Sequence, residues 1–186
     1  MRWRRATVLT AAVLSMAACA SESTPKSAEV GAKGATALID QQAWKPASAS
    51  HPFAAEEHPE EPGCAASFHV EDFDQQEVFE VDTALCATQT FVQQTVVDIA
   101  EGATVTVRGF YFELTANSPA QGHFAVALGD AVVVEQYVQI PSSSGGFERS
   151  FQAQKAYKAG TSIYFHVHNH GKNKWLLVAV ERAAPG

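Results

Sequence analysis

Residues 93–114 read QQTVVDIAEGATVTVRGFYFEL, and this stretch decides the expected fold. It consists of short runs of Val, Ile, Phe, Tyr and Thr interrupted by glycine, a texture typical of β-strands joined by turns. Ala100-Glu101-Gly102 places glycine where a hairpin needs a positive φ. The same texture runs from about Gly63 to the end of the chain, through FERSFQAQKAYKAGTSIYFHVHN at 147–169.

Nine strands are expected in this region, joined by turns such as Leu128-Gly129-Asp130 and by a longer loop over Pro141–Gly146. The aromatic triplet at 110–112 puts rings on both faces of its strand, so we expect that strand to be covered on both sides. Without a convincing helix, the pattern predicts an all-β fold, a single jelly-roll-like β-sandwich domain over 63–186. The expected strands are Ser67–Val70, Glu77–Val81, Thr90–Asp98, Thr104–Thr115, Gly122–Leu128, Ala131–Ile140, Phe147–Ala153, Ser162–Asn169 and Trp175–Arg182.

The order of these segments is similar to that of galactose-binding-like jelly rolls found in carbohydrate-binding modules. The resemblance spans about Thr90 to Arg182 and rests on strand order and turn placement. It implies a sandwich that binds a polysaccharide. The calcium-site and sugar-contact residues of that family have no position-by-position match in this sequence, so none is transferred.

The N-terminus predicts export from the cytoplasm. MRWRR is followed by an uncharged apolar run from Ala6 to Ala18, the pattern of a signal peptide over 1–18. This run, about 13 residues long, is too short to cross a bilayer as a helix. Met16-Ala17-Ala18-Cys19 resembles the lipobox of bacterial lipoproteins, with Met16 in place of the more usual Leu.

The lipobox resemblance implies cleavage before Cys19, acyl chains such as palmitate on that residue, and a membrane anchor in the cell envelope. In a bacterium with two membranes, Ala20 at the next position is compatible with delivery to the outer membrane.

Residues 19–62 are rich in Ala, Ser, Glu, Pro and Lys and hold few large apolar side chains. Such a composition buries too little apolar surface to offset the entropy lost on ordering. We therefore expect a disordered linker, in which Trp44, Phe53 and the segment ATALIDQQAW at 35–44 form at most a transient helical turn or a docking patch.

The charge and the cysteine content limit which classes of partner and which cellular compartment we expect. The whole chain has a formal charge of -7, and without the three arginines of 1–18 it reaches -10, which disfavours nucleic acid as a partner. Beyond Cys19, two cysteines remain, Cys64 and Cys86. In an oxidising compartment we expect them to form a disulfide bond, the alternative being two separate buried thiols.

The segment HVHNH carries His166, His168 and His170 at alternating positions of an expected strand. Their rings would then project from one face, about 6 to 7 Å apart, and could converge on Zn, Cu or Ni. A third ligand could come from His123, Glu113 or Glu135. The alternative is a histidine-bearing solvent face that runs into a turn at Gly171, with no cofactor at all.

The next segment, Gly171–Trp175, offers lysines, an amide and an indole at one end of the sandwich. Aromatic faces stack on sugar rings, so we expect a glycan to contact Trp175, Asn173, Asn169 and Lys172. The alternative is a tight turn followed by a core tryptophan.

Four enzyme classes are disfavoured. The spacing from Gly160 to His166 and His168 resembles the start of the cupin metal motif, but no glutamate follows within 169–173. Ser142–Gly146 lacks the framing of a serine hydrolase, and no phosphate loop or dinucleotide motif is present. We therefore expect a non-enzymatic, lipid-anchored envelope module that binds a glycan, with metal handling or docking of an envelope protein as alternatives.

Overall fold

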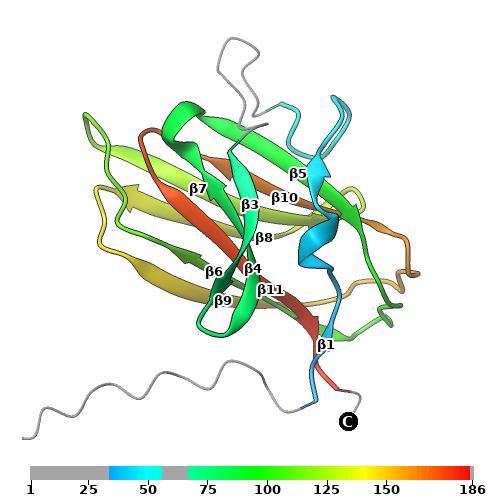
Figure 1. Cartoon of the computed structure of the whole chain (residues 1–186). Coiled ribbons are helices and arrows are strands. Elements are labelled where there is room, and N and C mark those ends of the chain that lie inside the picture. The colour runs from blue at the N-terminus through cyan, green and yellow to red at the C-terminus, as the bar shows by residue number, and fades with distance from the viewer. Residues whose placement is uncertain (1–33, 56–66, 185–186) are drawn as a thin grey trace, which may run out of the picture. The chain divides into compact units, whose positions relative to one another are not determined.

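The computed structural model describes residues 34–55 and 67–184, which form two antiparallel sheets stacked as a sandwich (Figure 1). Sheet A has the order β3-β4-β11-β6-β9, with β1 also paired to β11; sheet B has the order β2-β5-β10-β7-β8. The strands are β1 (Thr36–Ala37), β2 (Lys45–Pro46), β3 (Phe68–Phe73), β4 (Gln76–Asp82), β5 (Thr88–Gln94), β6 (Thr104–Tyr111), β7 (Ala120–Leu128), β8 (Ala131–Ile140), β9 (Gly145–Gln152), β10 (Ser162–His168) and β11 (Lys174–Arg182). Two short 3-10 helices, η1 (Gln41–Ala43) and η2 (Thr83–Leu85), complete the elements.

The predicted all-β sandwich is confirmed, and each of the nine expected strands is present with its ends shifted by a few residues. Gly129 sits in the β7–β8 hairpin and Gly102 in the turn before β6, both with positive φ as expected. The turn at 100–102 is not a hairpin, however, because β5 belongs to sheet B and β6 to sheet A. A glycine in the sequence predicts the turn, but it does not predict which sheet the following strand joins.

The core lies between the sheets and is rich in aromatic rings. Phe79 and Trp175 come from sheet A, whereas Phe91, Phe124 and Phe165 come from sheet B, and all five are fully buried. Burying a side chain of this size contributes about 1.5 to 3 kcal/mol. Gly122 lets the Trp175 indole approach sheet B, since a Cβ there would lie 2.5 Å from the ring.

Strand β6 is covered on both faces, as the aromatic triplet at 110–112 predicted. Tyr111 contacts the core side chain Trp175, with ring centroids 5.5 Å apart. On the opposite face, Phe110 and Phe112 contact Phe73 at the end of β3. The tip of the β3–β4 hairpin therefore bends over the outer face of sheet A, to which both strands belong, and Figure 1 shows the hairpin crossing in front of β11 and β6.

Residues 34–55 correct the expectation of a disordered linker over 19–62. β1 pairs with β11 of sheet A and β2 pairs with β5 of sheet B, so this segment joins the two sheets along one side of the sandwich. Leu38 and Trp44 enter the core, and Phe53 is fully buried on sheet B. Few apolar side chains suffice here because Leu38 and Trp44 pack into the core and Phe53 covers the outer face of sheet B.

Several predictions fall on residues outside the described part of the chain. These are the signal peptide over 1–18, lipidation at Cys19, the linker at 19–33 and 56–62, and the role of Cys64. Cys86 is buried, and its disulfide bond with Cys64 stays a prediction. Within 34–55 and 67–184, no helix is long and apolar enough to cross a membrane.

Candidate functional site

The outer face of sheet B carries a row of rings that we call the ring row: Phe53, His166, His123 and Tyr137. Alternation along β10 puts Ile163, Phe165 and Val167 in the core and leaves His166 and His168 on the outer face, as predicted. The register of β10 with β7 places His168 directly opposite His123. Strand pairing thus gathers histidines that lie more than 40 positions apart in the sequence.

Each ring of the row contacts the next one in space. Phe53 stacks on His166 with centroids 4.7 Å apart, and His166 meets His123 edge-on at 5.5 Å. His123 in turn stacks on Tyr137 at 4.3 Å with an interplanar angle of 6°. The row therefore connects a fully buried end at Phe53 with a solvent-facing end at Tyr137.

The solvent-facing end carries the polar groups. The Tyr137 side chain is 49% exposed, and its hydroxyl donates a hydrogen bond to Glu135 Oε1 at 3.1 Å. The same oxygen lies 3.2 Å from His123 Nε2. A ring face and a carboxylate are therefore presented together at this end of the row.

The buried end is electrically neutral. Burial lowers the pKa of His166 to about 3, and the nearby rings of His123, His168 and His51 lower it further. His166 Nδ1 lies 2.8 Å from the Thr90 hydroxyl, which fixes the orientation of the imidazole. At neutral pH His166 is therefore an uncharged ring packed among other rings.

A cavity of about 1000 Å³ opens beside the exposed end of the row. His123 and Tyr137 line it from the strands of sheet B, and His168, His170 and Lys172 line it from the end of β10 and the loop that follows. The remaining wall is largely the loop between β6 and β7, which contributes Asn117 and Ser118, together with Gln121 at the start of β7. Rings and hydrogen-bonding groups thus surround one solvent-open hollow, which is the usual make-up of a small-molecule site.

The structure brings together only part of the predicted HVHNH metal site. His166 is buried in the ring row, His168 is half-buried, and His170 lies exposed beyond the end of β10, with its ring 4.8 Å from that of His168. Of the three suggested further ligands, His123 lies against His166 and Glu135 contacts His123, whereas Glu113 is exposed in the loop after β6. Metal binding by these histidines stays a prediction.

Three of the four residues predicted to contact a glycan are buried, and the structure corrects the prediction for them. Trp175 is fully buried in the core, and Asn169 and Asn173 are almost fully buried. Asn169 Nδ2 donates to the Thr83 hydroxyl at 2.8 Å, and Asn173 Nδ2 donates to Asn169 Oδ1 at 2.7 Å. These side chains hold the β10–β11 loop in place and offer no surface to a sugar, so of the four residues only Lys172 is exposed.

The sequence-based site missed Tyr137 and Gln121, although both line the cavity with His168 and Lys172. Tyr137 lies in a predicted strand, where an isolated tyrosine is most simply interpreted as a packed residue. Only the pairing of β7 with β8, which sets Tyr137 opposite His123, brings it into the site.

The sequence matches no family model and no curated protein. Among solved structures, TmCBM27, described as a carbohydrate-binding module for specific mannan recognition, is similar at a TM-score of 0.51 and 4% identity, over 82% of this chain and 98% of that one. The CBM22-1 xylan-binding domain of Xyn10C from Paenibacillus barcinonensis has a TM-score of 0.44 and 10% identity, over 84% of this chain and all of that one.

An arabinose-bound α-L-arabinofuranosidase, MgGH51, has a TM-score of 0.48 and 10% identity over 78% of this chain. This chain spans only about a quarter of the length of that enzyme. At such low identity, the likeness to TmCBM27 establishes the fold, which is the jelly-roll sandwich of carbohydrate-binding modules.

Proposed function

We propose that this protein is a non-catalytic glycan-binding module, held by a lipid on Cys19 in the bacterial cell envelope. The observation that carries the proposal is the solvent-open cavity beside Tyr137, on the outer face of sheet B. The fold that the protein shares with TmCBM27 supports the same class of ligand. The signal sequence and the lipobox resemblance support the anchor.

The cavity has the chemistry that a sugar requires. A pyranose ring has an apolar face that stacks on an aromatic ring, and its hydroxyl groups need donors and acceptors around the rim. Tyr137 supplies the ring face, while Asn117, Gln121 and Lys172 supply amide and ammonium groups. A polysaccharide chain could pass through because the cavity is open to solvent.

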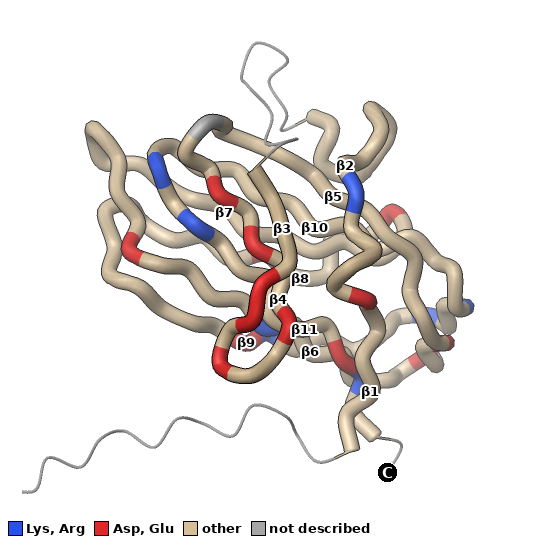
Figure 2. Tube along the Cα trace, in the orientation of Figure 1, with Lys and Arg blue, Asp and Glu red and all other residues tan. Residues whose placement is uncertain are grey.

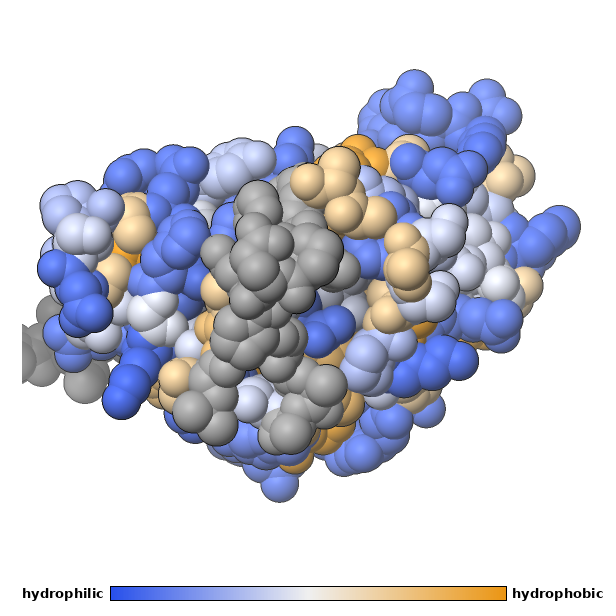
Figure 3. All heavy atoms as spheres, turned by 90° about the horizontal axis from the view of Figure 1, so that it is seen from above, coloured by the Kyte–Doolittle hydropathy of each residue, from blue (hydrophilic) through white to orange (hydrophobic). Residues whose placement is uncertain are grey.

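Large apolar side chains are scarce on the surface of the described residues, where the exposed ones are Val96, Val132 and Tyr137. On the face seen in Figure 3, hydrophobic patches are small and separated by hydrophilic residues, outside the part that grey atoms cover. A broad apolar docking surface would be contiguous. Small and separated apolar patches therefore favour a polar ligand over a large protein interface.

The test is affinity electrophoresis of the full-length protein, solubilised in detergent, through gels that contain mannan or xylan. We expect one of these probes to retard the wild type, Tyr137→Ala to weaken binding at least tenfold, and Tyr137→Phe to keep most of it because the ring remains. The matched control is Val132→Ala, an exposed residue on the same strand. Equal retardation of Tyr137→Ala and the wild type would rule out this site.

The anchor is tested separately. Replacing Cys19 by Ser should move the protein from the membrane fraction to the soluble fraction without changing its affinity for the polysaccharide. Retention of that variant in the membrane would contradict lipidation at Cys19.

A second candidate function is binding of Zn, Cu or Ni through HVHNH. The observation that favours it is the register of β10 with β7, which sets His168 opposite His123. A neutral imidazole is the form that binds a transition metal. In titrations with Zn²⁺, this candidate requires His168→Ala to lose binding.

A further inference from the structure

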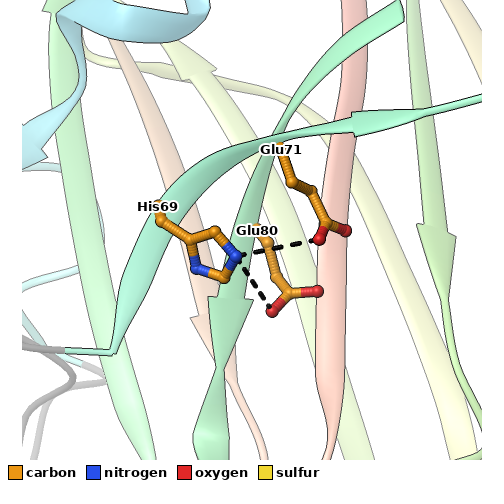
Figure 4. Close-up of side chains that lie close together, drawn as sticks. All are labelled: His69, Glu71 and Glu80. Carbon is orange, nitrogen blue, oxygen red and sulfur yellow. Dashed lines mark ion pairs between the residues drawn. The ribbon is translucent and has the colours of Figure 1, made fainter. Parts of the chain in front are cut away.

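A second cluster of ligand atoms lies on the other sheet, at the start of the β3–β4 hairpin. His69 and Glu71 are two residues apart on β3, so their side chains lie on the same face. Glu80 of β4 is the direct cross-strand partner of His69. Figure 4 shows the His69 imidazole and the two carboxylates turned toward one another.

The spacing of the three groups suits a metal ion. His69 Nε2 lies 3.7 Å from Glu71 Oε2 and 3.7 Å from Glu80 Oε1. All three ligand atoms lie within 4.8 Å of one another. Zinc lies about 2.0 to 2.2 Å from an imidazole nitrogen or a carboxylate oxygen, so two ligand atoms of one ion are typically about 3 to 4 Å apart.

Glu80, the buried member of the cluster, has one carboxylate oxygen that receives no hydrogen bond. Glu80 is 1% exposed, and its Oε2 has no hydrogen-bond partner. Its Oε1 accepts a hydrogen bond from Lys174 Nζ at 2.7 Å. A buried carboxylate oxygen without a partner is costly, and a cation between Glu80 and Glu71 would relieve that cost.

The surrounding charge attracts a cation. Figure 2 shows acidic residues along the β3–β4 hairpin, which holds Glu71, Asp72, Asp74, Glu77, Glu80 and Asp82. The hairpin itself contains no lysine or arginine, and Lys174 of β11 contacts Glu80. The net charge around the three groups is therefore negative.

The cluster is also open to solvent at one end. The His69 side chain is 53% exposed, so an ion can enter from that side. Lys174 is 46% exposed, which gives its ammonium group room to turn toward water when a cation approaches. One nitrogen and two oxygens leave at least one coordination position for water.

We propose that His69, Glu71 and Glu80 form a binding site for a divalent transition-metal ion, with Zn²⁺ as the test ion. The imidazole favours zinc over calcium and magnesium, which prefer oxygen ligands alone. The ion would tie β3 to β4 on sheet A, the sheet opposite the ring row. The site is therefore independent of the glycan site and of HVHNH.

The test is calorimetric titration of Zn²⁺ into the full-length protein and four variants. We expect binding at micromolar concentration or tighter in the wild type, and an affinity at least tenfold lower in His69→Ala and in Glu71→Gln. Both residues are partly exposed, so neither change should unfold the protein. The matched control is Glu77→Gln, an exposed glutamate of the same hairpin, and His168→Ala tests the other histidine cluster.

A site-specific readout completes the test. In long-range ¹H–¹⁵N spectra of the histidine rings, Zn²⁺ should shift Nε2 of His69 and leave His170 unchanged. Failure of the folded wild type to bind Zn²⁺ would overturn the proposal, and so would loss of binding in His168→Ala with His69→Ala unaffected. Retardation by mannan or xylan in the presence of EDTA reports on the glycan site alone, so the two proposals fail separately.

Discussion

Two histidine clusters lie on the outer faces of the two sheets, and their neighbours give them opposite properties. On sheet B, His166 is fully buried between Phe53 and His123, and burial lowers its pKa to about 3. On sheet A, His69 is about half exposed and lies between the carboxylates of Glu71 and Glu80. The same side chain is thus a neutral packing ring in one place and a candidate cation ligand in the other.

The difference comes from what covers each face. An N-terminal segment lays Phe53 over β7 and β10, which excludes water from His166. On sheet A the cover is the β3–β4 hairpin itself, whose Phe73 packs on Phe110 and leaves the His69 end open. An apolar cover produces a ring cluster, whereas a polar hairpin produces an ion-pair cluster.

Removing the apolar cover should have the largest effect. Phe53→Ala is expected to cost about 3 to 5 kcal/mol of unfolding free energy, because a fully buried phenyl ring is lost and His166 is uncovered. Urea denaturation at pH 7 measures the loss. Phe73→Ala, in the partly buried cluster on sheet A, should cost clearly less, and an equal loss would contradict the comparison.

Breaking the ion pair on sheet A should have the next largest effect. Lys174→Met leaves the Glu80 carboxylate buried beside the His69 ring and the Glu71 carboxylate, and we expect a loss of about 2 to 3 kcal/mol. The double variant Lys174→Met with Glu80→Met should regain most of the stability, because no buried charge is left. Lys172→Met is the matched control, since Lys172 is exposed and should change stability by less than about 0.5 kcal/mol.

Acid should produce the smallest of the three effects, and it should act mainly on sheet B. His166 has a pKa of about 3 in the folded protein and about 6.5 when unfolded, so the unfolded chain binds more protons below pH 6.5. Its contribution to stability is therefore complete above pH 6.5 and is lost as the pH falls toward 3. Between pH 7 and pH 5 the loss should be about 2 kcal/mol.

Urea denaturation at several pH values measures this slope, and the titratable rings that face His166 are His123, His168 and His51. His166→Phe keeps a ring in place without a titrating group, so its slope should be flatter than that of the wild type. His170→Ala, which removes an exposed histidine, should keep the wild-type slope. The same slope in His166→Phe and the wild type would show that His166 is not the group responsible.

The strands were predictable because each carries its own signal. Alternation along β10 correctly separated Ile163 and Phe165 from His166 and His168. Strands β1 and β2 were missed because two residues are too few to show a period, and 34–55 has the composition of a linker. The apolar residues of this segment contribute to the fold because Leu38 and Trp44 pack between the two sheets.

The candidate sites were predictable only in part. The cluster of His69, Glu71 and Glu80 was missed because Glu80 lies nine residues beyond Glu71 and reaches it only through the register of the hairpin. Trp175 was interpreted as a sugar contact because a loop sequence precedes it, but its strand turns the indole into the core beside Gly122. In both cases the decisive neighbour belongs to another strand.

By itself, the amino-acid sequence determined the β-sandwich, the positions of its nine long strands and the face of β10 that carries the histidines, because strand periodicity and turn chemistry are local. It also predicts the exported, lipid-anchored state through a signal that lies outside the described residues. Only the tertiary structure decided which histidines are buried, that Tyr137 borders the cavity, and that 34–55 belongs to the fold. These properties depend on strand pairing and on what covers each sheet, and such contacts join residues far apart in the chain.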